Sequence, residues 1–215
     1  MIPLRDALPA RQPPRMTLTC LAILVLADVG IRRSPAPMEL LATWALAPAY
    51  SIWPEALAAP WMHAGLAPLV VSGGAIWLFG EAVEDRLGGV RFLLLLLLCT
   101  ACGVLGHAAA HAASRMPVAG AGVIAAGIIA AHLRLHPNGR LLAFAGRIVE
   151  VPAAAVAAGW LLLQAFDAAG LLVPAGPVRG WSLAALAGSG AAGVLLVSLL
   201  DRRERGRVEW YYREG

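Results

Sequence analysis

The stretch of sequence that decides the fold is residues 61–88, which read WMHAGLAPLVVSGGAIWLFGEAVEDRLG. From residue 65 to residue 80 it contains no aspartate, glutamate, lysine or arginine, whereas Glu81, Glu84, Asp85 and Arg86 cluster directly after it. Apolar runs of this kind cross the hydrocarbon core of a bilayer as helices, and charged side chains are expected where a helix leaves that core. We therefore predict a membrane-spanning helix that ends at this cluster of charges.

The composition of the whole chain predicts a membrane protein with several spans. Of its 215 residues, 60% are hydrophobic and 14% are charged, and the mean hydropathy is +0.72. A soluble domain needs a polar shell that such a composition does not supply. Six apolar runs approach or exceed the roughly 18 residues that a spanning helix needs. They are residues 17–31, 65–80, 92–113, 117–133, 148–170 and 181–200, of which the first two are the shortest.

These runs predict an all-α fold, a polytopic bundle of six transmembrane helices. The expected organisation is a cytoplasmic N-terminal segment 1–15, a membrane domain 16–200 and a cytoplasmic C-terminal tail 201–215. The tail is charged and ends with the aromatic residues Trp210, Tyr211 and Tyr212, which suits a segment lying at the inner membrane interface.

The distribution of arginine predicts the orientation of the chain. The isoelectric point of about 9.5 would raise the question of nucleic acid in a soluble protein, but these arginines lie between spans, so no nucleic-acid partner is expected. With both termini in the cytoplasm, only Arg32, Arg33, Arg115 and Arg179 lie outside. The inner side then carries the other 13 of the 17 basic residues: Arg5, Arg11, Arg15, Arg86, Arg91, Arg134, Arg140, Arg147, Arg202, Arg203, Arg205, Arg207 and Arg213.

Several motifs resemble those of the bacterial rhomboid family, and together they cover essentially the whole chain. Residues 61–88 are similar to the family's Phe-Leu-His-Ala-Gly run and to the Val-Glu-Asp-Arg-Leu-Gly that closes its second helix. The opening IPLRD and the TWALAPAY at 43–50 resemble its first segment and first external loop. GAGVIAAG at 120–127, Trp160 to Gln164, and LAGSGAAG at 186–193 are similar to its fourth, fifth and sixth helices. The resemblance implies a six-helix protein of the bacterial inner membrane.

The resemblance also implies where catalytic groups would stand, and this chain departs from the family at each position. Members of the family resemble other serine hydrolases in needing a nucleophilic hydroxyl, a base and oxyanion donors. The nucleophile position is Gly122 and the base position is Leu186. The positions of the oxyanion-binding histidine and asparagine are Pro68 and Ser72, so only a short hydroxyl remains there. We therefore predict a catalytically inactive rhomboid-like pseudoprotease without a cofactor.

By analogy with inactive members of the family, we expect this protein to bind the transmembrane helices of client proteins within the membrane lipids. The predicted fourth and sixth helices are dense in small residues, which let helices approach closely in lipid. The residues expected to contribute to binding are Gly120, Gly127, Gly188, Ser189 and Gly193.

Two alternative functions stay open at this stage. One is an intramembrane serine protease with displaced catalytic residues, in which Ser72, Ser182 or Ser189 is the nucleophile and His107 or His111 is the base. The other is a structural subunit of a larger membrane complex, which the same small-residue faces would serve. Serines within spans more often bond to a carbonyl one turn back, so the displaced protease is the less favoured hypothesis.

The histidines and cysteines do not predict a metal site. His107 and His111 are four residues apart, as are His132 and His136, which places each pair on one helical face, but neither pair has a third ligand in the sequence. Cys20, Cys99 and Cys102 all fall within apolar runs, and an odd number of buried thiols argues against a disulfide framework.

Overall fold

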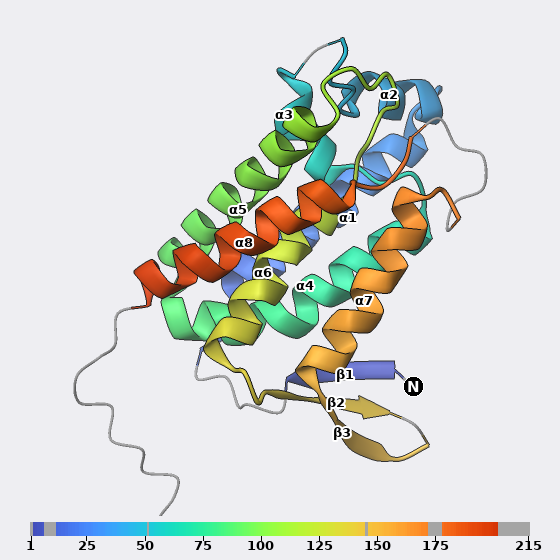
Figure 1. Ribbon diagram of the computed structural model, residues 1–215. Coiled ribbons are helices and arrows are strands. Elements are labelled where there is room, and N and C mark those ends of the chain that lie inside the picture. The colour runs from blue at the N-terminus through green and yellow to red at the C-terminus, as the bar shows by residue number, and fades with distance from the viewer. Residues whose placement is uncertain (1, 7–11, 51, 145, 172–177, 202–215) are drawn as a thin grey trace, which may run out of the picture.

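The computed structural model describes residues 2–6, 12–50, 52–144, 146–171 and 178–201, and it is mostly helical (Figure 1). Its longer helices are α1 (Arg15–Arg33), α4 (Leu66–Leu87), α5 (Gly89–Ala110), α6 (Gly122–Leu135), α7 (Ala153–Ala168) and α8 (Leu183–Leu200). Its shorter elements are α2 (Pro37–Trp44), α3 (Glu55–Ala58), the 3-10 helix η1 (Ala59–Trp61), and the strands β1 (Ile2–Asp6), β2 (Arg140–Phe144) and β3 (Ile148–Pro152).

Each of the six longer helices overlaps one of the six expected spans, and together they form one bundle, which confirms the predicted class of fold. By length and composition α4, α5 and α8 are able to cross a membrane, whereas α6 and α7 are shorter apolar helices. Helix α6 has 14 residues and is surrounded by other helices, because its residues 122–129 are all buried. A helix that contacts protein along its length need not match the full thickness of the lipid core.

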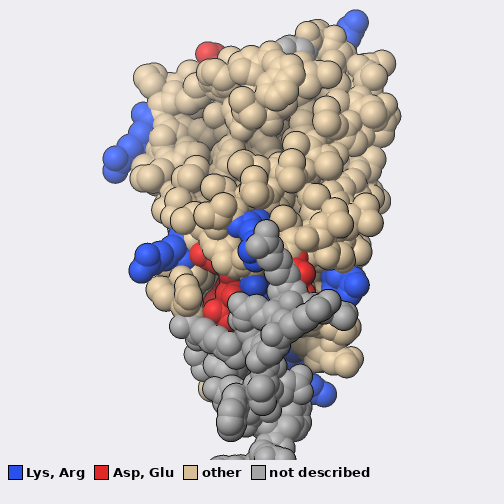
Figure 2. Space-filling model, turned by 90° about the vertical axis from the view of Figure 1, so that its left-hand side faces the viewer, with Lys and Arg blue, Asp and Glu red and all other residues tan. Residues whose placement is uncertain are grey.

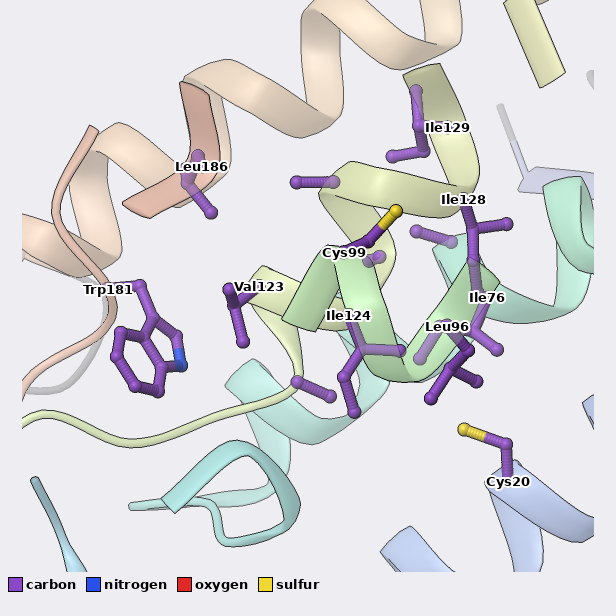
Figure 3. Close-up of a cluster of buried hydrophobic side chains, with 14 of the residues drawn as sticks. Cys20, Ile76, Leu96, Cys99, Val123, Ile124, Ile128, Ile129, Trp181 and Leu186 are labelled. Atoms are coloured by element: carbon purple, nitrogen blue, oxygen red, sulfur yellow. The ribbon is translucent and has the colours of Figure 1, made fainter. Parts of the chain in front are cut away.

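The core of the bundle is built where α8 packs closely on α5 and α6. Figure 3 shows Val123, Ile124 and Ile128 of α6 lying among Cys99 of α5, Ile76 of α4 and Leu186 of α8. On the face shown in Figure 2, uncharged side chains cover most of the surface and the charged ones gather mainly toward one end. Such a distribution suits a protein whose middle faces hydrocarbon and whose end faces headgroups and water.

The charged cluster after residue 80 lies within α4, which continues to Leu87, and one of its residues stabilises the beginning of another helix. Glu84 is only 7% exposed, and its carboxylate accepts hydrogen bonds from the backbone N–H groups of Met16 and Thr17, each at 2.8 Å. The hydroxyl of Thr17 donates a third, also at 2.8 Å. Since the first N–H groups of a helix have no partner within it, this carboxylate of α4 acts as the cap of α1.

The bounds of two predicted spans were wrong. Residues 148–152 are strand β3 rather than the beginning of a helix. Residues 117–121 are also not helical: Val118 bridges Leu46 and Arg179, and a bend and a turn at residues 120–121 lead into α6. Residues 148–152 read IVEVP, and three of the five are β-branched, which favours a strand. An apolar run alone does not distinguish a strand from a helix.

A small antiparallel sheet, in the order β1-β2-β3, was not predicted from the sequence. It lies at the end of the bundle below α7 in Figure 1 and joins part of the expected segment 1–15 to the connection between α6 and α7. Residues 202–215, which include the aromatic residues expected at the inner interface, lie outside the described residues.

Candidate functional site

Gly122, the predicted nucleophile position, is the first residue of α6, and the chain before it is held by three parts of the fold. Val118 forms backbone bridges with Leu46 and Arg179. The N–H of Ala121 donates to Nε2 of His63, at 3.1 Å, and the indole N–H of Trp181 donates to the carbonyl of Gly120. The start of α6 is therefore fixed by side chains from the segments that precede α4 and α8.

The space beside Gly122 is filled by a polar side chain from another helix. A Cβ atom at Gly122 would overlap Nε2 of Gln164 on α7, and the three atoms nearest to that Cβ all belong to Gln164. The Gln164 carboxamide therefore lies where a nucleophilic side chain would begin. Gln164 is 4% exposed, so the carboxamide is enclosed by protein.

Leu186, the predicted base position, belongs to the apolar core. It is 4% exposed and projects from α8 near Val123 and Trp181 in Figure 3. Its neighbours Ala185 and Ala187 on α8 also lack a group that accepts a proton. This turn of α8 therefore contributes packing and no titratable group.

The two predicted oxyanion positions lie in the first two turns of α4, and both are buried. Pro68 has no backbone N–H to donate and fits here because the first N–H groups of a helix have no partner within it. Ser72 is buried and retains one hydroxyl. Of the two donors that the family places here, a single hydroxyl is left.

The small residues predicted to bind partners pack inside this chain. A Cβ at Gly193 would overlap the carbonyl of Gly127, and a Cβ at Gly188 would lie 3.1 Å from the carbonyl of Cys102 on α5. Ser189 donates to the carbonyl of Val123 at 2.7 Å. Gly120, Gly127, Ser189 and Gly193 are all buried. Their use in contacts with a client stays a prediction, and their contacts within the chain join α8 to α5 and α6.

The structure brings together one of the displaced serine and histidine pairs considered above. Nδ1 of His107 on α5 lies 2.9 Å from Oγ of Ser182, the residue that precedes α8. The His107 ring stacks on His111 and meets the edge of Trp181, with ring centroids 4.9 and 5.5 Å apart. Ser182 Oγ also caps α8, because it accepts from the N–H of Ala185 at 3.3 Å. The Ser189 hydroxyl, another candidate nucleophile, instead donates a hydrogen bond to the backbone carbonyl of Val123.

A buried contact between a histidine and an aspartate near the sheet was missed from the sequence. Nε2 of His132 lies 2.7 Å from a carboxylate oxygen of Asp6, and both side chains are at most 1% exposed. The two residues are 126 positions apart, so spacing gave no signal. The ring of His136 lies 5.2 Å from that of His132. Among the described residues, no group of three potential ligands could hold a metal ion.

Burial shifts the titration of two histidines outside the membrane-spanning segments. It lowers the pKa of His63 to about 4, and Asp28 raises that pKa in partial opposition. It also lowers the pKa of His136, which follows α6. His63 is thus neutral near pH 7, as it must be for Nε2 to accept the N–H of Ala121.

The fold and these positions define a polytopic membrane bundle with the frame of an intramembrane serine hydrolase. Comparison with known families agrees, because the model of the rhomboid domain matches residues 51–203, more than half of the chain. The chain belongs to the rhomboid family. Searches of curated proteins and of solved structures gave no match to it.

Proposed function

We propose that this protein is a non-catalytic member of the rhomboid family that binds the transmembrane helices of other membrane proteins. The observation that carries the proposal is the pair Gly122 and Gln164, because the nucleophile position has no side chain and the space beside it is occupied by a carboxamide. Leu186 adds to this support, since an alkyl side chain accepts no proton. In subtilisin, a serine protease of a different fold, removing the reacting groups lowers kcat by about six orders of magnitude.

Binding of helices is the activity that the remaining frame supports best. In lipid, helices associate through close packing and interhelical hydrogen bonds, and a bundle that keeps its packed core offers its outer helices for such contacts. We propose that binding takes place in the bacterial inner membrane with both termini in the cytoplasm, as the distribution of arginine suggests.

A second candidate function is hydrolysis by a displaced serine and histidine pair, and the 2.9 Å contact between Ser182 and His107 favours it. Ser182 precedes α8, where N–H groups of the first turn have no helical partner and suit an oxyanion. Two observations weigh against it. The Ser182 hydroxyl already caps α8, and Nε2 of His107 has no partner among the described residues that would orient the ring, as a third group does in catalytic triads.

Activity-based labelling in proteoliposomes separates the two candidates. The full chain is treated with a fluorophosphonate that reacts with activated serines, and cleavage of a generic rhomboid substrate is followed in parallel. We expect neither labelling nor cleavage above the level of the Ser182→Ala variant. Labelling of the parent that is lost in both Ser182→Ala and His107→Gln would replace the proposed function by the displaced hydrolase.

Binding itself is tested by photocrosslinking in native membranes. Photoreactive residues on the lipid-facing side of the bundle are expected to capture several different single-span proteins in amounts below one per copy. Capture of one fixed set of subunits in constant ratio would instead assign a structural role in a complex, and capture of lipid alone would contradict client binding.

A further inference from the structure

Two buried polar atoms without partners lie one helical turn apart on α7. Oε1 of Gln164 and Nε1 of Trp160 make no hydrogen bond in the part of the chain that the structure describes. Gln164 is 4% exposed and Trp160 is 7% exposed. Leaving a buried polar group without a partner is costly, and most such groups in proteins are satisfied by protein, water or ligand. These two atoms therefore have capacity for a ligand.

The two atoms differ in kind, and this restricts the ligand. The indole Nε1–H of Trp160 only donates, whereas Oε1 of Gln164 only accepts. Residues four apart on a helix share a face and are separated by about 6 Å along the axis. A carboxamide carries an acceptor and donors on separate atoms, so it can pair with both groups at once.

The Gln164 side chain is also directed to the site described above. Its carboxamide lies against Gly122, at the beginning of α6, and a side chain at position 122 would displace it. The helix that carries it packs more sparsely on α4 and α6 than α8 packs on α5 and α6. Because both side chains are buried, α7 has to move away from its neighbours for another helix to reach them.

We propose that Trp160 and Gln164 bind the side-chain carboxamide of an asparagine or glutamine within a client's transmembrane helix. The client carbonyl accepts from Trp160 Nε1–H, and the client NH₂ donates to Gln164 Oε1. A carboxamide alone in hydrocarbon lacks partners, so this site satisfies both its groups. The proposal rests on the proposed function, since it specifies which helices are bound.

The test uses the full chain in liposomes and a synthetic leucine-rich span with one central asparagine, compared with the same span carrying leucine there. Association is measured by energy transfer between labelled peptide and labelled protein at low peptide content, so that peptide self-association is small. Interhelical hydrogen bonds contribute about 0.6–2 kcal/mol each, so with two of them we expect the asparagine span to bind at least about sevenfold more tightly.

Three variants identify the residues responsible. Gln164→Leu and Trp160→Phe are expected to reduce the asparagine preference to about twofold or less, while the leucine span binds as before. Trp77→Phe changes a tryptophan of α4 that is 38% exposed, and it should leave the preference unchanged. Thermal unfolding in detergent establishes that each variant is folded.

The outcomes distinguish this proposal from the proposed function. Equal binding of both spans to the parent protein would overturn the carboxamide site and leave helix binding intact. An asparagine preference that persists in both Gln164→Leu and Trp160→Phe would also overturn it. Binding of neither span, together with capture of lipid alone in native membranes, would contradict the proposed function itself.

Discussion

The two ends of the bundle differ in how many polar side chains pair with one another. Beside the sheet, Glu84 caps α1, Asp6 pairs with His132, and Arg86 makes two hydrogen bonds with Asp201, at 2.9 and 3.0 Å. At the other end, the positions that would carry catalytic groups are Gly122, the first residue of α6, and Leu186, in the first turn of α8. Among the described residues, the polar groups that join helix ends are in place, whereas Gly122 and Leu186 carry no polar side chain. The polar contacts that hold the fold are therefore made by residues other than these two.

The largest effect is expected from Glu84→Ala, which tests the end beside the sheet. The change leaves two backbone N–H groups and the Thr17 hydroxyl without their acceptor in a buried place. Hydrogen bonds to charged groups contribute about 1.5–3 kcal/mol each, and we expect a loss of about 3 kcal/mol in the free energy of unfolding. Denaturant unfolding in detergent measures it. Glu81→Ala is the matched control on the same helix, and an equal loss there would show that the cap has no special role.

A smaller effect is expected at the other end, from Gly122→Ser. Because the new side chain overlaps Gln164, we expect overpacking to destabilise the protein by about 2 kcal/mol. Gln164→Ala in the same chain should recover most of that loss. The measurement is thermal unfolding of the single and double variants, and additivity of the two changes would refute the direct contact.

A third prediction concerns the reactivity of a serine introduced at position 122. Gly122→Ser with Leu186→His restores the family's two reacting residues, yet Gln164 still fills the space beside the introduced serine. We expect fluorophosphonate labelling of that serine only when Gln164→Ala is added, with a gain of at least about fivefold over the double variant. Equal labelling of the double and triple variants would show that the carboxamide does not block the position.

The smallest effect is a pH dependence of stability from His63. Its folded pKa of about 4 is below the ordinary value of 6.5, so the unfolded chain binds more protons between these values. Stability from this group is therefore complete above about pH 6.5 and is lost progressively as the pH falls toward 4. His136 contributes in the same direction. In His63→Gln a side-chain carbonyl can still accept the Ala121 N–H, so the free energy of unfolding should depend less on pH between about 4 and 6.5. An unchanged pH dependence would show that His63 is not its source.

Much of the fold followed from the sequence, because long apolar runs and the charges between them have few alternatives in a bilayer. The sheet did not, since β1 pairs with a strand more than 130 residues later and five-residue strands give weak periodic signals. At the site, the resemblance identified Gly122 and Leu186 as the nucleophile and base positions. It did not predict that Gln164 fills the space beside Gly122. Which neighbouring helix fills a space depends on packing between distant segments, and Gln164 read alone was one polar residue in an apolar span.

The pairing of Asp6 with His132 has a consequence for biogenesis. Residues 2–6 leave the ribosome long before β2 and the far end of α6 exist, so the first strand waits unpaired while the spans from α1 to α5 are inserted. Its docking is then one of the last events at that end of the molecule. Nascent chains arrested before residue 140 should therefore have an N-terminal segment that is open to protease and to chaperones, even though their first helices already lie in the membrane.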